Sequence, residues 1–315
     1  MWFKQLQLFQ LTDSSTYQIN TLIDKLEPLA FKPCLPSTFS SVGWVSPVDE
    51  EDAQLARSIN GCIMLCLQVE DKILPATVIR QELSERIKHI ETTESRKVYQ
   101  KEKLALKDDI IMTLLPRAFS KHTKLYAYID TKNQWLVLGT NNTKKAEQFI
   151  SMFKRSISDK VHPFEIKKLS STMTHWLKNQ NYPSSFAIEK ACVLQDPNQQ
   201  NRIIRCQHQD LFASGIQALI KDGCEAQQLA LSWHDQVNFV LSSTFSLSGI
   251  KFLDHVKEQI SEIEAETKQQ LFHADFLIMT GTFSSLLKEL LGQFIEIGGS
   301  SEKSTAIPAK ADADQ

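Results

Sequence analysis

A polar, helix-forming segment enclosed by two prolines separates two stretches of the chain that are typical of β-strands. The first stretch, GCIMLCLQVEDKILP, ends at Pro75, and the second, KLYAYIDTKNQWLVLGT, covers residues 124–140. Proline fixes φ and has no N–H donor, so a helix does not continue through Pro75 or Pro116. The segment between the strands is therefore predicted to lie outside the sheet, as a helical insertion over residues 76–121.

The insertion itself divides into two helices. Its first part keeps one apolar face, formed at helical spacing by Ile79, Leu83, Ile87 and Ile90. That face stops in ETTESRK, residues 91–97, which contains no apolar residue, and apolar residues return in a new phase from Val98 to Leu115. We therefore expect two helices that project from a sheet, rather than one long rod.

The rest of the chain indicates an α+β protein with antiparallel sheets. Residues 124–140 predict a β-hairpin around Asp130–Asn133, while strands are expected at 2–12, 41–47 and 162–169 and a helix at 144–158. From about residue 169 the pattern changes to a helix that gives way to a loop within 171–185 and to helices at 210–224, 254–270 and 283–297, with strands at 187–196 and 201–207 and two more within 227–252. We expect a central sheet domain (1–75 and 122–168), the inserted helical tip (76–121), an α+β base domain (169–297) and a disordered tail (298–315).

Charge is distributed unevenly along the chain. The net charge is −2, but residues 72–168 contain twenty Lys/Arg and eleven Asp/Glu, a net charge of +9, which leaves −11 for the remainder. A basic middle segment is able to bind a polyanion, although Lys and Glu also favour solvated helix surfaces. Lys88, Arg96, Lys103 and Lys107 fall roughly opposite the first apolar face of the insertion. Both interpretations, a binding surface and a solvated surface, remain open on this ground.

The stretch LLPRAFSKHTK, residues 114–124, places an aromatic side chain among cations. Because Pro116 ends the preceding helix, Arg117, Phe119 and Lys121 are predicted to lie on a turn at the distal end of the insertion. Phe119 then either folds back into a core or projects toward a ligand with flat rings and a negative backbone. We expect a partly exposed side chain.

No arrangement of residues indicates catalysis. The phosphate-binding pattern GxxxxGK[ST] does not occur, His234–Asp235 is typical of a polar turn, and Asp108 and Asp109 point in different directions on a helix. The six cysteines are interpreted as structural thiols, including Cys62 and Cys66 on one strand. The sequence contains no apolar run of membrane-spanning length and no secretion signal. We therefore expect a cytoplasmic, non-enzymatic protein without metal or cofactor and without a membrane partner.

Several short motifs, in this order and at these spacings, resemble the recombination-associated RdgC family. They are FKPC (31–34), VGWVSP (42–47), KILPATVI (72–79), LLPRAFS (114–120), KKAE (144–147), LALSW (229–233) and FHADFLIMTG (272–281). Each motif alone is weak, but the ordered set is specific and extends from residue 1 to about residue 295.

The resemblance implies a DNA-binding protein without sequence preference that restrains the RecA recombinase. It implies a horseshoe-shaped subunit with central, tip and base regions, and a homodimer that closes into a ring around double-stranded DNA in the nucleoid. Whether single strands also bind is left open, and so is direct contact with RecA. The alternative hypothesis is an interaction protein whose basic tip docks on an acidic protein partner.

The expected site residues combine this resemblance with the basic insertion. DNA contacts are predicted for Lys72, Lys88, Arg96, Lys97, Lys101, Arg117, Phe119 and Lys121. A contact between subunits is predicted for Phe119, and for Leu287, Leu290 and Leu291 of the last apolar helix, whose alternative is burial within the chain. Relatives tend to carry lysines before the motif QDL, where this chain has Arg205-Cys206-Gln207-His208, so a basic contribution from the base region is limited to Arg205.

Overall fold

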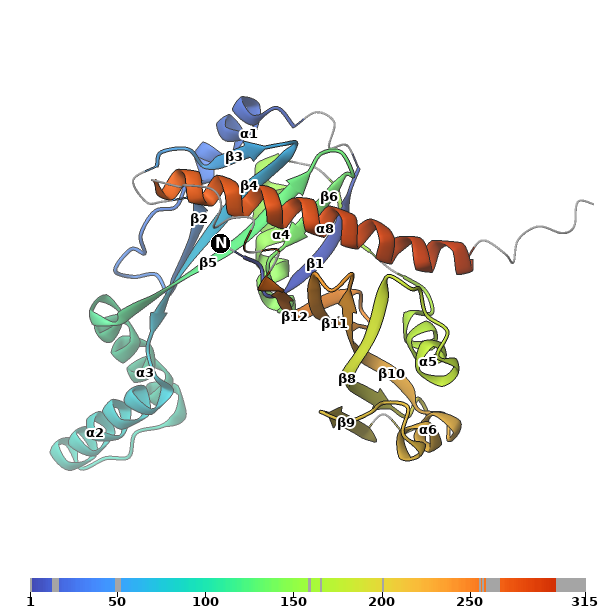
Figure 1. Ribbon diagram of the computed structural model, residues 1–315. Coiled ribbons are helices and arrows are strands. Elements are labelled where there is room, and N and C mark those ends of the chain that lie inside the picture. Colours follow the sequence, from blue (N-terminus) through green and yellow to red (C-terminus); the bar gives the residue numbers. More distant parts are fainter. Residues whose placement is uncertain are drawn as a thin grey trace, which may run out of the picture. The chain divides into compact units, whose positions relative to one another are not determined.

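The computed structural model describes residues 2–12, 17–48, 52–157, 160–164, 166–199, 201–254, 256, 258 and 267–298. Of residues 295–298 it describes only the backbone. The chain divides into two compact units (Figure 1). The N-terminal unit comprises Gln5–Phe164, and the C-terminal unit comprises Met1–Lys4 with Glu165–Gln315. The α+β class with antiparallel sheet is confirmed, while the horseshoe outline and the predicted domain boundaries stay predictions.

The N-terminal unit is an antiparallel sheet in the order β2-β4-β5-β6-β1, with β3 added to β4 and β7 added to β1. Its strands are β1 (Leu6–Leu11), β2 (Ser40–Val45), β3 (Ala56–Ile59), β4 (Cys62–Ile73), β5 (Phe119–Asp130), β6 (Trp135–Leu138) and β7 (Val161–Pro163). Its helices are α1 (Ile19–Leu26), η2 (Glu27–Leu29), α2 (Ala76–Glu94), α3 (Gln100–Leu114), η3 (Leu115–Arg117) and α4 (Thr143–Ile157). The predicted hairpin around Asp130–Asn133 is confirmed as β5 and β6.

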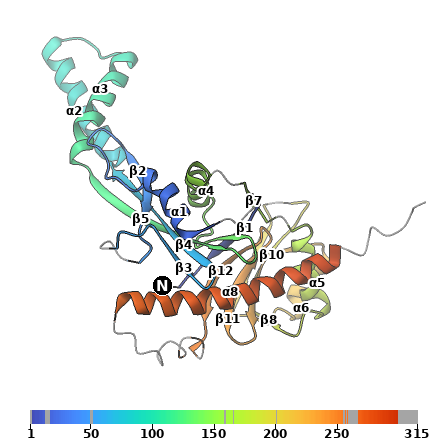
Figure 2. The same cartoon turned by 90° about the horizontal axis from the view of Figure 1, so that it is seen from above.

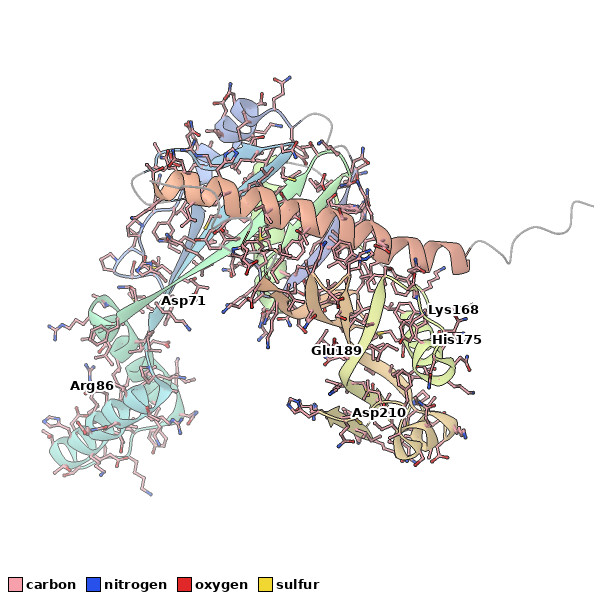
Figure 3. The ribbon with its side chains drawn as sticks, viewed as in Figure 1. Asp71, Arg86, Lys168, His175, Glu189 and Asp210 are labelled. Atoms are coloured by element: carbon pink, nitrogen blue, oxygen red, sulfur yellow. The ribbon has the colours of Figure 1, made fainter. Side chains whose placement is uncertain are left out.

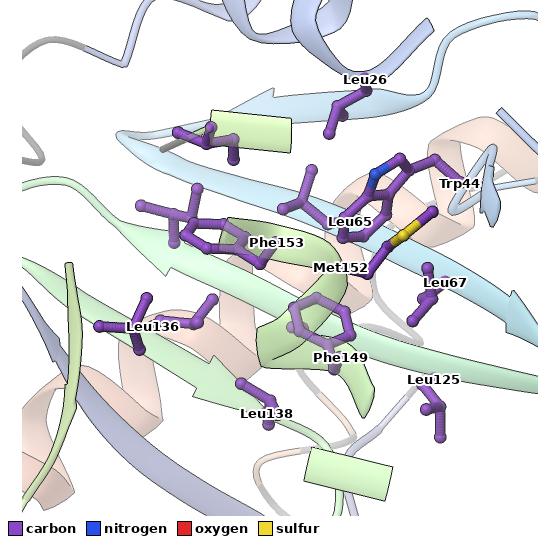
Figure 4. Packing of buried hydrophobic residues seen from close by; sticks show 14 of the residues in the cluster. Leu26, Trp44, Leu65, Leu67, Leu125, Leu136, Leu138, Phe149, Met152 and Phe153 are labelled. Atoms are coloured by element: carbon purple, nitrogen blue, oxygen red, sulfur yellow. The ribbon is translucent and has the colours of Figure 1, made fainter. Parts of the chain in front are cut away.

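One face of this sheet forms the core of the N-terminal unit (Figure 4). Alternate residues of β4 and β5 point to it, because successive side chains of a strand face opposite sides, and α1 and α4 pack over them. The indole of Trp44 meets the ring of Phe149 edge-on at 5.3 Å and donates a hydrogen bond to the Ser156 hydroxyl at 2.8 Å. The core therefore ties β2 to α4 through both apolar and polar contacts.

The C-terminal unit has a second antiparallel arrangement, in the order β12-β11-β10-β8-β9. Its elements are α5 (Leu169–Asn179), β8 (Phe186–Gln195), β9 (Ile203–Gln207), α6 (Ser214–Lys221), β10 (Glu225–Trp233), β11 (Val237–Ser242), β12 (Ser246–Phe252) and α8 (Lys268–Gly298). The long helix α8 is anchored by aromatic contacts, among them Phe283 against Phe252 with ring centroids 5.3 Å apart and Phe294 against Trp176 at 5.8 Å.

Several predicted boundaries of helices and strands are wrong. Residues 227–252 form three strands instead of two, because turns near His234 and Phe245, both with positive φ, divide the alternating pattern. Helix α8 begins at Lys268, fifteen residues before the predicted start, and absorbs the motif FHADFLIMTG. The strand expected at 162–169 is reduced to the three residues of β7, and β3 was missed because it is only four residues long.

Two further predictions fall on parts of the chain outside the described residues. These are most of the polar helix expected at 254–270 and the tail from residue 299 onward.

Candidate nucleic-acid interface

A two-stranded ribbon extends from the sheet of the N-terminal unit and bears the helical insertion (Figures 1 and 2). Strands β4 and β5 pair over twelve residues each, from Cys62 opposite Asp130 to Ile73 opposite Phe119. Their inner halves are buried, while Asp71 and Ile73 on β4 and residues 119–122 on β5 are exposed. Because α2 starts directly after β4, and α3 leads through η3 into β5, the two helices leave the sheet together at the end of this ribbon.

The insertion is a helical hairpin whose two helices pack mainly on each other. The predicted apolar face of α2, formed by Ile79, Leu83, Ile87 and Ile90, is half-buried. No residue of α2, which is described throughout, is fully buried, whereas Ile110 of α3 is. Arg86 of α2, labelled in Figure 3, forms an ion pair with Asp109 of α3. The hairpin is therefore a thin projection in which polar contacts supplement a small apolar seam.

The turn between the helices, residues 95–99, is here called the distal loop. Ser95 closes α2 in the left-handed conformation, with φ of 51°, and Val98 is buried beneath the loop. The guanidinium of Arg96 donates two hydrogen bonds of 2.7 Å to the carboxylate of Glu102 and a third bond to Glu94. These bonds, those with Glu102 first, raise the pKa of Arg96 above its ordinary value. Arg96 therefore holds the loop closed, and two carboxylates already compensate its charge.

The lysines of the distal region are placed differently from Arg96. Lys97 is exposed within the distal loop, Lys101 is exposed on the first turn of α3, and Lys88 is exposed on α2. Within the described part of the chain, none of these three lysines forms an ion pair. All three are therefore free to approach a phosphate, and so is Lys107 of α3, which is exposed as well.

The remaining predicted residues lie at the base of the hairpin. Arg117 belongs to η3, Phe119 and Lys121 to β5, and Lys72 to the end of β4. The distal turn that the sequence predicted for Arg117, Phe119 and Lys121 is wrong, because the turn between the helices lies at residues 95–99 and the chain has already returned toward the sheet at Pro116. The nineteen residues of α2 separate the distal loop from the base of the hairpin by roughly 28 Å at 1.5 Å per residue.

Phe119 is 84% exposed, in agreement with the expectation of an outward-facing ring. It occupies the first position of a strand rather than a turn, since Ala118 already has extended backbone angles. Its cross-strand partner Ile73 is 48% exposed and points to the same face, because residues directly opposite in an antiparallel pair share a face. Phe119 and Ile73 therefore form an apolar pair on the surface.

Polar contacts fix the strands beside this pair. Hydrogen bonds from the Ser120 hydroxyl and from the backbone N–H of Cys34, 2.8 Å from the carboxylate, lower the pKa of Glu70. Asp71, labelled in Figure 3, stands opposite Lys121 in the ladder. The backbone N–H of Lys72 bonds to the carbonyl of Phe39 at 2.8 Å. The base of the hairpin is thus held in place by the pairing of β4 with β5 and by the loop that precedes β2.

The predicted subunit contact through the last apolar helix needs correction. Leu287 and Leu290 have no exposed surface, and Leu291 is also buried. All three lie in α8 between Phe283 and Phe294, which contact aromatic rings of the C-terminal unit. These leucines, which the sequence suggested would contact a second subunit, are buried by packing within the chain itself.

Comparison with known proteins identifies the family. The family model described as "Putative exonuclease, RdgC" matches residues 1–297. The recombination-associated protein RdgC of Psychromonas ingrahamii is 36% identical over 296 residues, which cover 93% of this chain and 98% of that protein. Those of Yersinia enterocolitica and Yersinia pestis are 34% and 33% identical over 293 residues, 92% of this chain and 97% of each relative. The chain belongs to the RdgC family. Its membership confirms the resemblance carried by the ordered motifs.

The exonuclease named in that description raises the question of a catalytic site in this RdgC-family chain. Among the described residues, no group of three or more His, Cys, Asp or Glu side chains could hold a metal ion. Glu289 accepts hydrogen bonds from Trp233 at 2.8 Å and from the His234 ring at 3.3 Å. Burial opposes ionisation of Glu289, but the bonds from Ser185 and Trp233 outweigh it and lower its pKa. The carboxylate lies at the centre of this group, whereas a hydrolase triad requires the histidine there.

The group around Glu289 is therefore interpreted as an anchor between α8 and the turn from β10 to β11. His234 and Asp235 both have positive φ, at 46° and 51°, and lie in the three-residue connection between the paired Trp233 and Val237, where Gln236 donates its N–H to the carbonyl of Trp233 at 2.8 Å. This geometry agrees with the polar turn predicted from the pair His234–Asp235.

The sequence analysis missed Tyr99 and Ile73 as surface residues of this RdgC-family hairpin. Tyr99 is 76% exposed in the distal loop, and it is the only aromatic residue in a polar stretch from 91 to 103. That contrast between an aromatic residue and its polar neighbours was visible in the sequence. In the part of the chain that the structure describes, no helix combines the length and the apolar character needed to cross a membrane.

Proposed function

We propose that this chain binds DNA without sequence preference, as a homodimeric ring around double-stranded DNA, and restrains RecA-promoted recombination. The names of its relatives in Psychromonas ingrahamii and Yersinia enterocolitica associate them with recombination. The observation that carries the proposal is the exposed lysines, without ion pairs among the described residues, on a hairpin that follows the paired strands β4 and β5. The proposal includes a cytoplasmic, nucleoid-associated location and binding of DNA without a cofactor.

Phosphate contacts are assigned first to the lysines of the distal region. Each Lys–phosphate contact releases condensed counterions, so its contribution to affinity falls as salt rises. Lys88, Lys97 and Lys101 fit this role, whereas Arg96 serves mainly to hold the loop. Lys72, Arg117 and Lys121 offer a second set of contacts at the base of the hairpin, which the length of α2 separates from the distal loop by roughly 28 Å.

The apolar pair of Phe119 and Ile73 is proposed as the place where two subunits meet. An exposed phenylalanine beside an exposed isoleucine costs solubility, and a second copy of the same surface would cover both side chains. Closing a ring in this way adds topological retention on duplex DNA, which phosphate contacts alone do not supply. With DNA occupied, RecA filaments lose access to it, and restraint of recombination needs no direct contact with RecA.

A salt titration of duplex binding tests the proposal. The variant Lys97→Ala/Lys101→Ala should weaken binding to unrelated duplex sequences equally and flatten the plot of log affinity against log salt by about 0.9 per lost contact. The control Lys144→Ala/Lys145→Ala removes the same charge from exposed positions on α4, and should change the slope less. An unchanged slope in the loop variant, with normal folding, would contradict the proposal.

The same proteins separate the competing functions. If the hairpin docks on an acidic protein instead, duplex affinity should not respond to the loop lysines. A nuclease test with labelled single and double strands in the presence of Mg²⁺ or Mn²⁺ addresses the name of the family model. We expect intact DNA, and specific shortening by the purified protein would overturn the non-enzymatic proposal.

A further inference from the structure

We infer that Tyr99 is a base-stacking side chain, with which the distal loop binds unpaired nucleotides. The inference rests on the proposed DNA binding and assigns a role in it to one residue of the distal loop. Tyr99 is the most exposed large apolar side chain on the described part of the chain apart from Phe119, with 76% of its surface accessible. It lies roughly 28 Å from Phe119 by the length of α2, so the two aromatic residues serve different contacts.

The backbone of Tyr99 is fixed although its ring is free. Tyr99 precedes the first turn of α3 in an extended conformation, with φ of −86° and ψ of 164°. Its carbonyl accepts the N–H of Lys103 at 3.0 Å. The preceding residue, Val98, is buried and donates its N–H to the carboxylate of Glu91 at 3.2 Å. These contacts hold the loop, so the phenol ring is presented outward at little further loss of conformational entropy.

The charges around Tyr99 favour a nucleic acid as its ligand. Lys97 and Lys101 lie two residues before and two residues after it, both exposed and, within the described residues, without an ion-pair partner. The two acidic residues nearest the loop, Glu94 and Glu102, are occupied by Arg96. An aromatic ring between two free cations is the combination with which proteins bind single strands, since the ring stacks on a base and the cations neutralise neighbouring phosphates.

Unpaired bases are a better partner for this ring than duplex DNA. In a duplex both faces of each base are already stacked, so a phenol ring gains little without opening a base step. Proteins that open base steps from the minor groove insert apolar wedges such as Phe, Leu, Ile, Met or Pro, whereas tyrosine carries a hydroxyl that must stay hydrated. Stacking on an already exposed base needs no such opening and depends little on the identity of the base.

Fluorescence anisotropy with a labelled single strand and a duplex of the same length, at matched salt, tests the inference. Tyr99→Ala should weaken single-strand binding roughly 5- to 140-fold, the effect of one lost stacking contact, and change duplex binding by less than about 2-fold. Tyr99→Phe should bind like the unmodified protein, and Tyr99→Leu like the alanine variant. Leu104→Ala is the matched control, because Leu104 is a 53% exposed apolar residue on α3, the helix that Tyr99 directly precedes.

The outcomes separate this inference from the proposed function. If Lys97→Ala/Lys101→Ala weakens both DNA forms while Tyr99→Ala alters neither, the stacking role is overturned and phosphate binding stands. Equal losses on both DNA forms, or a weaker dimer with unchanged single-strand affinity, would also overturn it. If the lysine variant and Tyr99→Ala both leave all DNA binding unchanged, the proposed function itself fails. Quenching of a 2-aminopurine base in the strand by the native protein but not by Tyr99→Ala would support stacking directly.

Discussion

Truncating Leu290 distinguishes a core residue of the C-terminal unit from a contact between subunits. Its side chain has no exposed surface, so Leu290→Ala removes buried atoms and leaves a cavity. Such a change costs about 3 kcal/mol of unfolding free energy, and more if the surroundings do not relax. For a body of this size, that loss lowers the melting temperature by roughly 6–12 °C.

Leu277→Ala on the same helix is the matched control. Leu277 is 39% exposed, so its truncation should cost about 1 kcal/mol or less. Urea unfolding followed by tryptophan fluorescence suits the comparison, because Trp176 and Trp233 both contact α8. The measurement should be made at two protein concentrations tenfold apart.

A residue of the chain's own core gives a loss of stability that does not depend on protein concentration. We expect this result for Leu290→Ala, with unchanged self-association of the folded protein. The reasoning would be refuted by a variant whose unfolding midpoint matches that of the native chain but whose dimer dissociates at lower dilution. That result would instead support a contact between subunits through the leucines of α8.

Three further changes have defined outcomes. Phe119→Ala should alter stability by less than about 0.5 kcal/mol, because the ring is exposed, and sedimentation should instead show weaker self-association. Gly43→Ala should cost about 3 kcal/mol in urea unfolding, since its Cβ would lie 2.3 Å from a backbone carbon of the neighbouring loop, whereas Gly215→Ala, with open space around it, should not destabilise. Hydrogen bonds from Ser120 and a backbone amide lower the folded-state pKa of Glu70, so its contribution to stability is present above the unfolded pKa and is lost as pH falls. The stability difference between the native chain and Glu70→Gln should therefore shrink between about pH 6 and pH 3, and a constant difference would count against this role.

Local patterns in the sequence were sufficient for features that depend on neighbouring residues. The turn around Asp130–Asn133 predicted the hairpin of β5 and β6, and the spacing of Ile79, Leu83, Ile87 and Ile90 predicted the inner face of α2. The prolines at 75 and 116 marked where the chain leaves and re-enters the sheet. In each case the residues that determine the local structure lie in the same short stretch as that structure, because turn chemistry and helical periodicity act over a few residues.

The placement of side chains on the surface or in the core needed the tertiary structure. Leu290 and Phe119 are both apolar, yet one is fully buried and the other almost fully exposed, since burial depends on which distant segments pack against each residue. Arg96 resembled the neighbouring Lys97 in sequence, but the return of α3 brings Glu102 within 2.7 Å and occupies its charge. The sequence by itself determined the hairpin of β5 and β6, the inner face of α2, the basic segment and the family. Only the folded hairpin decided which cations stay free to bind a ligand, because the packing of α2 against α3 pairs Arg86 with Asp109 and the geometry of the distal loop brings Glu94 and Glu102 to Arg96.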